Sequence, residues 1–203
     1  MKRLTGADYE VDAVVAAKLL LGKWLCRRLP GGRVLKARIV ETEAYCGEGD
    51  TACHAHCGKT ERNAPMYEAG GIAYVYLCYG MHNLLNVVTG EPGNPEAVLI
   101  RGVEGAVGPG RATRLLQIDR SLNREPLATS ERMWIEDDES RPPRFKATPR
   151  IGIAYATRRD QNRKWRFVVE GAKRFLCKDH AAQATCSRSA TRWLKNSSSL
   201  FDL

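Results

Sequence analysis

The stretch Ile39-Val40-Glu41-Thr42-Glu43-Ala44-Tyr45 predicts a β-strand that carries two acids. Its branched and aromatic residues are typical of strands. A carboxylate buried without a partner loses its hydration at a high free-energy cost, so each acid needs an ion-pair partner or a chemical task. In a regular strand, alternation puts four residues on one face: Ile39, Glu41, Glu43 and Tyr45. That alternation does not decide which acid has the task.

Regular elements are predicted on both sides of this strand. Asp12 is a suitable N-cap for a helix over residues 13–21, and Gly22 is a suitable stop. Residues 24–29 and 34–45 predict the two strands of a hairpin, because turn residues separate them. The same reasoning predicts further strands at 72–79, 84–88, 97–103, 151–154 and 164–169, and a second helix at 111–117.

Other segments lack such periodicity. Residues 46–71 predict a long loop, and long ordered loops in compact domains are usually functional. The acidic run 136–139 predicts a solvated loop. From residue 178 the chain is rich in Ser, Thr, Ala and charge, which indicates a poorly structured tail. We therefore expect one domain over residues 1–177 and a C-terminal tail over residues 178–203.

The composition is that of a globular domain with a basic surface. The chain has 203 residues, 43% of them hydrophobic and 27% charged. Its formal net charge of +9 favours a polyanionic partner, although a merely basic surface explains the charge equally well. No signal peptide and no bilayer-spanning stretch are predicted. We expect an intracellular protein, in the cytoplasm, nucleoid or nucleus, that is not secreted, binds no membrane and keeps its seven cysteines reduced.

An aromatic hairpin is the first candidate functional element. Tyr74 and Tyr76 share one strand face, and Tyr79 falls at the turn, followed by Gly80 and Met81. Packing in a sheet is the simpler interpretation of tyrosines in a strand. On a basic protein, a projecting Tyr-Gly-Met tip also suggests a wedge between stacked bases.

A loop with three cysteines and two histidines is the second candidate. Its thiols and imidazoles are Cys46, Cys53, His54, His56 and Cys57. Such groups can bind zinc, but the paired C-x-x-C spacing of a closed structural site is absent. A single loop histidine such as His54 is more often hydrogen-bonded than catalytic. We expect no metal here, and a zinc-dependent nucleic-acid module remains an alternative.

The two acids are the third candidate. Structural pairing with Lys36, Arg38 or Arg101 is the simpler role for a strand carboxylate. A carboxylate in a pocket beside tyrosine and histidine would instead suit proton abstraction from water. Both interpretations remain open for Glu41 and for Glu43.

An ordered series of motifs extends over most of the chain, from about the first helix to Phe175. The series is Arg38-Ile39-Val40-Glu41-Thr42-Glu43-Ala44-Tyr45, Cys53-His54, Arg62-Asn63, Tyr74-Val75-Tyr76, Tyr79-Gly80-Met81, Asn86, Ala97-Val98-Leu99-Ile100-Arg101 and Gly108-Pro109-Gly110. This series closely resembles the alkyladenine, or 3-methylpurine, DNA glycosylase family. The resemblance implies a mixed α/β (α+β) single domain of that family's own type, on a curved antiparallel sheet with flanking helices. It also implies a monomer without metal or cofactor.

The activity implied by the resemblance is base-excision repair of duplex DNA. Such an enzyme flips out alkylated or deaminated purines, such as 3-methyladenine, 7-methylguanine and hypoxanthine. It then hydrolyses the N-glycosidic bond and leaves an abasic site. No lysine stands in the matched catalytic motifs to form a Schiff base, so we expect a monofunctional enzyme without lyase activity.

Residue roles follow from the matched motif positions. Glu43 resembles the general base that activates water, and Arg101 its partner in holding that water. Four residues would form the base pocket: Tyr45, His54, Tyr76 and Asn86. The first three would sandwich the base, and Asn86 would crowd the exocyclic amine of normal guanine. Tyr79, supported by Met81, would fill the gap in the duplex, and Glu41 would be left with structural pairing.

Some positions depart from the family pattern. Cys53, His56, Cys57 and Asn83 stand where other residue types are expected, which puts the DNA contacts of the loop in doubt and not the catalysis. A protein that binds and flips lesions without excising them is the alternative from a different class. The presence of both Glu43 and Arg101 argues against it.

Overall fold

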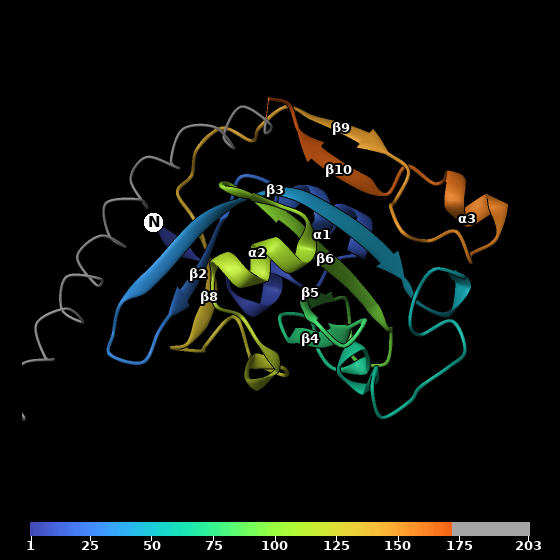
Figure 1. Cartoon of the computed structure of the whole chain (residues 1–203), viewed down its shortest axis with the longest axis horizontal. Helices are drawn as coiled ribbons and strands as arrows, with labels where there is room; N and C mark the ends of the chain where they lie inside the picture. Colours follow the sequence, from blue (N-terminus) through green and yellow to red (C-terminus); the bar gives the residue numbers. More distant parts are fainter. Residues whose placement is uncertain (172–203) are drawn as a thin grey trace, which may run out of the picture.

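The computed structural model describes residues 1–171, which form one domain built on an antiparallel sheet (Figure 1). The ten strands of this part are β1 (Lys2–Arg3), β2 (Trp24–Arg28), β3 (Val34–Cys46), β4 (Ala73–Cys78), β5 (His82–Thr89), β6 (Glu96–Val103), β7 (Ala106–Val107), β8 (Met133–Asp137), β9 (Phe145–Thr148) and β10 (Arg166–Val169). The α-helices described are α1 (Ala13–Leu19), α2 (Pro109–Leu115) and α3 (Arg158–Asn162). Short 3₁₀ turns are η1 (Gly6–Asp8), η2 (Gly47–Gly49), η3 (Ala64–Tyr67) and η4 (Arg120–Leu122). The predicted α+β class is confirmed.

Strand β3 is the axis of the sheet, which is not closed into a barrel. The strand order is β1-β8-β2-β3-β6-β5-β4, and β10 pairs with β3 outside this path and carries β9. The first part of β3 pairs with β2, and its second part pairs with β6 and β10. Figure 1 shows β3 curving across the whole molecule, with α2 in front of the sheet and α1 behind it. The long curved strand therefore joins the two ends of the domain.

The alternation of β3 is interrupted at the acids. Register shifts against β6 lie between Ile39 and Glu41 and between Glu41 and Thr42. As a result Ile39 and Ala44 both pack in the main core, and the Thr42 hydroxyl donates to the Ala17 carbonyl of α1 at 2.7 Å. A regular strand would have put Ile39 and Ala44 on opposite faces. The irregularity changes the face of the strand just before Glu43.

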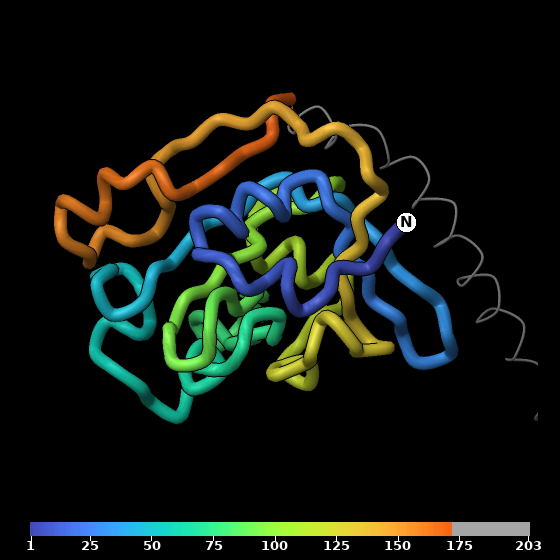
Figure 2. Tube along the Cα trace, turned by 180° about the vertical axis from the view of Figure 1, so that it is seen from behind, coloured from blue at the N-terminus to red at the C-terminus, as the bar shows by residue number. Residues whose placement is uncertain are grey.

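The main core lies between β3, β6 and helix α1. Alanines Ala13, Ala16 and Ala17 of α1 are buried against it, which lets the helix approach the sheet closely. Asp12 caps this helix as predicted, accepting hydrogen bonds from the Val14 and Val15 amides. Figure 2 shows the same helix from behind, lying across the strands. The helix ends at Leu19, two residues earlier than predicted.

Three further sequence predictions are wrong in detail. The second helix begins at Pro109 rather than Arg111, because proline is favoured in a first helical turn. Residues 151–154 form turns instead of a strand. The acidic run is not a solvated loop, because Glu136 and Asp137 end strand β8 and, with Asp138, pair with Lys36, Lys23 and Arg38. Opposite charges across the sheet hold this run in place.

No helix in residues 1–171 is long and apolar enough to cross a membrane. The predicted tail beyond residue 177, and the boundary before it, lie outside the described residues.

Candidate active site

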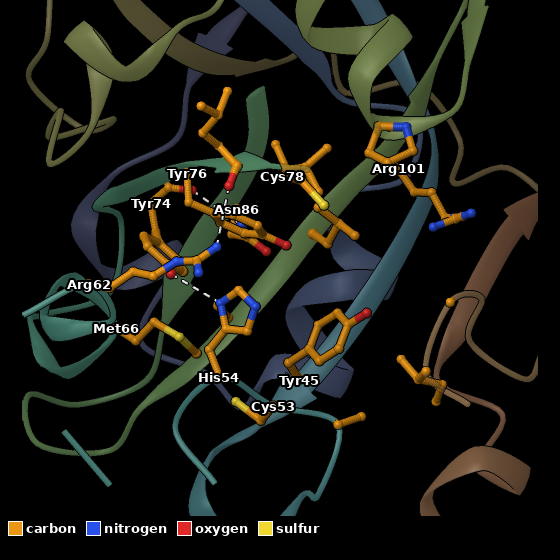
Figure 3. A pocket seen from close by; sticks show the side chains of 18 of the residues that line it. Tyr45, Cys53, His54, Arg62, Met66, Tyr74, Tyr76, Cys78, Asn86 and Arg101 are labelled. Atoms are coloured by element: carbon orange, nitrogen blue, oxygen red, sulfur yellow. Dashed lines mark hydrogen bonds between the residues drawn. The ribbon is translucent and has the colours of Figure 1, made fainter. Parts of the chain in front are cut away.

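A cavity of about 650 Å³ opens where the β4–β5 hairpin faces the end of β3 (Figure 3). Its walls come from β3, the loop after it, the hairpin, β6 and the 151–155 segment. Lining residues include Tyr45, Cys53, His54, Arg62, Tyr74, Tyr76, Cys78, Asn86, Arg101, Ile151 and Tyr155. Every residue predicted to form the base pocket is among them. Its volume falls within the range of small-molecule sites, roughly 300–1,000 Å³.

Glu43 lies behind the cavity wall, in contact with the lining residues Tyr45, Arg101 and Ile151, and its side chain is fully buried. Its Oε2 accepts a 2.9 Å hydrogen bond from the Tyr45 hydroxyl, and its Oε1 accepts one of 2.9 Å from the Ile151 amide. Arg101 Nε lies 3.5 Å from the same Oε1. Burial raises the pKa of Glu43, and Arg101 and the two hydrogen bonds oppose that rise. A raised pKa makes a carboxylate a stronger proton acceptor once it is ionised.

Arg101 connects the two acids. Its Nε lies 3.0 Å from Glu41 Oε1 as well as 3.5 Å from Glu43. Glu41 also accepts a 2.6 Å hydrogen bond from Arg166 Nε of β10. The absence of a side chain at Gly102 makes room for it, since a Cβ there would lie 3.1 Å from the Glu41 Cβ. Glu41 is thus held by two arginines, in agreement with the structural pairing expected from the sequence.

The aromatic side chains gather on one side of the cavity. The rings of Tyr74 and Tyr76 lie 5.2 Å apart, as their shared strand face predicts. His54 packs edge-on against Tyr76 at 4.6 Å between ring centroids, and its Nδ1 lies 3.0 Å from the Tyr74 hydroxyl. Figure 3 shows His54 and Tyr45 reaching into the cavity from below these tyrosines. Together they offer flat apolar faces and one imidazole to a planar ligand.

The imidazole is kept neutral by its surroundings. Loss of hydration in the cavity, and then the nearby Arg62 charge, lower the pKa of His54. Asn63 holds the loop behind it, donating to the carbonyls of His54 and Gly58 at 2.8 and 2.9 Å. A neutral His54 can either donate or accept a hydrogen bond toward a ligand.

Asn86 closes the cavity on the β5 side. Its side chain is buried, and its Nδ2 donates to the Tyr74 carbonyl at 3.2 Å. This bond fixes the orientation of the amide across the β4–β5 pair. The amide therefore offers a rigid polar surface at the cavity wall.

The tip of the hairpin projects into solvent. Tyr79 is 90% exposed and Met81 is 69% exposed, although both are large apolar side chains. Tyr79 has a φ of 50° and Gly80 one of 70°, so both lie in the left-handed region. That conformation is uncommon for a bulky residue, and such outliers cluster at ligand-binding sites. The tip stands beside the cavity, because Tyr79 and Gly80 also line it.

The Cys and His loop does not form a metal centre in the described part of the chain. No group of three or more His, Cys, Asp or Glu side chains in residues 1–171 is arranged to hold an ion. Burial raises the pKa of the Cys53 thiol to about 11, so in this site the sulfur is a protonated thiol. His56 faces away, with its Nδ1 2.8 Å from the Glu48 carbonyl oxygen, and Cys57 is exposed.

Two contributors to the cavity were missed in the sequence. The 151–155 segment supplies the Ile151 amide to Glu43 and the side chain of Tyr155, whose hydroxyl donates to the Ala52 carbonyl at 3.0 Å. A hydrogen bond from a backbone amide does not depend on the residue type, so the sequence could not indicate it. The sequence also predicted a strand at residues 151–154. The guanidinium of Arg62 lies 5.2 Å from the centre of the Tyr76 ring. Arg62 belongs to one of the matched motifs, but its position there did not predict a contact with the cavity.

Comparisons with known proteins identify the family of this chain. The model of the methylpurine-DNA glycosylase family matches residues 7–107 and 103–173. Three relatives share the name "Putative 3-methyladenine DNA glycosylase". The one from Psychrobacter cryohalolentis is 45% identical over 172 residues, covering 70% of this chain and 80% of its own. The one from Methanocella arvoryzae is 44% identical over 179 residues, covering 78% and 88%. The one from Borreliella afzelii is 41% identical over 174 residues, covering 80% and 93%. With matches over most of its length, the chain belongs to the methylpurine-DNA glycosylase family and is a DNA glycosylase.

Proposed function

We propose that this enzyme flips alkylated and deaminated purines out of duplex DNA and hydrolyses their N-glycosidic bonds with a water activated by Glu43. The substrates are 3-methyladenine, 7-methylguanine and hypoxanthine. The observation that carries the proposal is the buried Glu43, held by Tyr45, Ile151 and Arg101, three residues that line an aromatic cavity.

The first step is extrusion of the damaged nucleotide. Flipping costs a few kcal/mol of lost stacking and pairing, and a damaged or mispaired base lowers that cost. The exposed ring of Tyr79, with Met81 two residues on, enters the gap and offsets part of the loss. The base then enters the cavity beside the hairpin tip.

Recognition of the base depends on the cavity walls. Tyr45, His54 and Tyr76 contact the faces of the purine, and the electron-rich rings attract a cationic lesion such as 7-methylguanine. Asn86, whose amide is held by the Tyr74 carbonyl at the cavity wall, is the group that crowds the exocyclic amine of guanine in this proposal. This contact disfavours normal guanine relative to hypoxanthine, which lacks the amine, whereas 7-methylguanine keeps the amine and is favoured by its positive charge.

Hydrolysis needs a proton acceptor and stabilisation of positive charge on the sugar. The water oxygen bonds to the glycosidic carbon, the base leaves with the electron pair of the broken bond, and Glu43 takes the water proton. The same carboxylate stabilises the sugar as it gains oxocarbenium character. Glu43 has no exposed surface, so Arg101 or Ile151, which contact it and line the cavity, must move to admit the water.

The reaction ends at an abasic site. No lysine is among the described residues that line the cavity, so a Schiff base with the sugar has no amine there. The test is to incubate the protein with a duplex that carries one hypoxanthine. The product is divided into two halves, and one half is treated with alkali, which cleaves the strand at abasic sites. Strand cleavage is expected only in the half treated with alkali. Cleavage without alkali would contradict the monofunctional mechanism, and no cleavage on any of the three lesions would leave a protein that binds lesions without excising them.

A further inference from the structure

A buried ion pair lies directly behind the Tyr45 wall of the cavity. Arg150 and Asp50 are fully enclosed, and two parallel bonds join them, Nη1 to Oδ2 at 2.5 Å and Nη2 to Oδ1 at 2.7 Å. Arg150 does not line the cavity, and none of the steps above uses it. Its role needs another explanation.

The guanidinium of Arg150 contacts the parts of the chain that hold Glu43. It lies 4.7 Å from the centre of the Tyr45 ring and 5.1 Å from the centre of the Trp165 ring. Its Nη1 also donates to the Ala44 carbonyl at 2.9 Å, one residue from Glu43. The next residue in the chain is Ile151, whose amide donates to Glu43. Arg150 therefore packs against Tyr45 and is adjacent in the chain to Ile151, the two residues that donate hydrogen bonds to Glu43.

Asp50 fixes the other end of this arrangement. Its Oδ1 accepts from the Ala52 amide at 3.1 Å and its Oδ2 from the Cys46 amide at 3.3 Å, so it is part of the loop that follows β3. Through the pair, this loop is tied to the segment that carries Ile151, a hundred residues later. The two sides of the cavity end are therefore held at a fixed separation.

We propose that the Arg150–Asp50 pair positions the Tyr45 hydroxyl and the Ile151 amide on Glu43, and so sets the geometry of the base for water activation. Arg150 is a positioning residue that acts through Tyr45 and Ile151. The inference rests on the proposed role of Glu43.

The energetics of the pair favour such a role over simple stabilisation. Removing two charges from water is costly, and apolar replacements of buried ion pairs are often as stable or more so. The pair is also incompletely satisfied, since the buried Nε of Arg150 has no hydrogen-bond partner in residues 1–171. A forked guanidinium does, however, fix direction as well as distance, which a catalytic geometry needs.

The excision rate should fall at low pH as Glu43 becomes protonated. The pH at which this fall occurs, the acid limb of the rate profile, depends on how Tyr45 and Ile151 are placed. The charged or titratable groups near Glu43 are Glu41, Tyr45, Arg101 and Arg166. The Ile151 and Tyr45 bonds lower the pKa of Glu43, and its burial raises that pKa. If the Tyr45 hydroxyl and the Ile151 amide are displaced, they lower the pKa of Glu43 less, and burial then raises this pKa further. Because the base must be ionised, excision would then begin at a higher pH.

The main test variant is Arg150→Lys, which keeps the charge and loses the fork. We expect the single-turnover excision of hypoxanthine to fall by about 10- to 100-fold, since small misplacements of catalytic groups cost up to that much. The acid limb is expected at higher pH, and affinity for a duplex with an abasic-site analogue is expected to stay unchanged. The double variant Asp50→Asn, Arg150→Met removes both charges together and should behave in the same way.

The matched control is Arg163→Lys. Arg163 also lies over Trp165, at 4.1 Å, but it pairs with Asp160 and does not contact Tyr45. This variant should keep the rate and the acid limb of the unmodified protein, and thermal unfolding is followed for all variants.

Three results would overturn the inference. If folded Arg150→Lys has the same excision rate and the same acid limb as the unmodified protein, the two parallel bonds of the Arg150 guanidinium are not needed for positioning. The same defect in Arg163→Lys would show that any change near Trp165 suffices. Failure of both test variants to fold would show that the pair serves the fold. Absence of excision by the unmodified protein would instead refute the proposed function itself.

Discussion

The Tyr45 hydroxyl donates a 2.9 Å hydrogen bond to Oε2 of Glu43, two residues earlier on the same strand. The two side chains share a strand face, so the bond forms within β3 itself. It gives Tyr45 two roles, because the same ring lines the cavity. The bond therefore couples a residue of the cavity wall to the buried carboxylate of Glu43.

The first prediction separates the two acids. Glu43→Gln should retain binding to lesion-containing DNA and lose at least about 100-fold in excision rate, because an amide cannot accept the water proton. Glu41→Gln should keep measurable excision, since Glu41 is paired with Arg101 and Arg166, whereas Glu43 is bonded to the cavity residues Tyr45 and Ile151. Single-turnover kinetics on a hypoxanthine duplex measure both. The reverse order of defects would assign the base to Glu41.

The second prediction concerns the pH dependence of Tyr45→Phe. Tyr45 lowers the pKa of Glu43, which burial raises, so removing the hydroxyl raises that pKa further. Glu43 is active when ionised, and the acid limb of the excision rate should therefore move to higher pH while the ring still lines the pocket. Tyr67→Phe is the control, because the Tyr67 hydroxyl donates to Glu48 instead. An acid limb that stays in place would mean that the bond does not tune the base.

The third prediction tests the hairpin tip. Tyr79→Ala should weaken both the affinity for lesion-containing duplex and the excision rate, because nothing then fills the vacated stack. Single-stranded substrate should be affected less, since it has no gap to fill. Leu19→Ala removes another exposed apolar side chain, on α1, and should change neither quantity. Equal rates for Tyr79→Ala and the unmodified protein on duplex DNA would remove Tyr79 from the flipping step.

The fourth prediction concerns metal. Treatment with EDTA should leave excision unchanged, and elemental analysis should find no stoichiometric zinc. The reason is geometric, since no three His, Cys, Asp or Glu side chains in residues 1–171 are arranged to hold an ion, and His54 is hydrogen-bonded to Tyr74. Zinc that is present in equal amount and lost in Cys53→Ser, Cys57→Ser would restore the alternative of a zinc module.

Local sequence patterns predicted much of the scaffold around the site. The Asp12 cap, the 24–45 hairpin and the shared face of Tyr74 and Tyr76 depend on neighbours within a few residues, and each is present. The exposed Tyr79 also follows from its place at a turn. Such features need only short-range chemistry, which a sequence displays directly.

The predicted alternation of side chains along β3 is wrong around Glu41, where the strand is irregular. The register shifts around Glu41 depend on how β6 pairs with β3, and the room for Glu41 depends on Gly102, which is about sixty residues away in the chain. The strand predicted at 151–154 failed for a related reason. Its backbone forms turns, and the Ile151 amide is used by Glu43 rather than by a neighbouring strand.

The sequence by itself determined the family, through the order of its motifs, and named a set of side chains most of which line one cavity. Only the tertiary structure decided how the two acids differ. Glu41 is held by Arg101 and Arg166, whereas Glu43 accepts bonds from Tyr45 and Ile151. The physical reason is that the state of a buried carboxylate depends on its hydrogen-bond partners and its loss of water. Most of those partners come from strands and loops that only the folded sheet brings together.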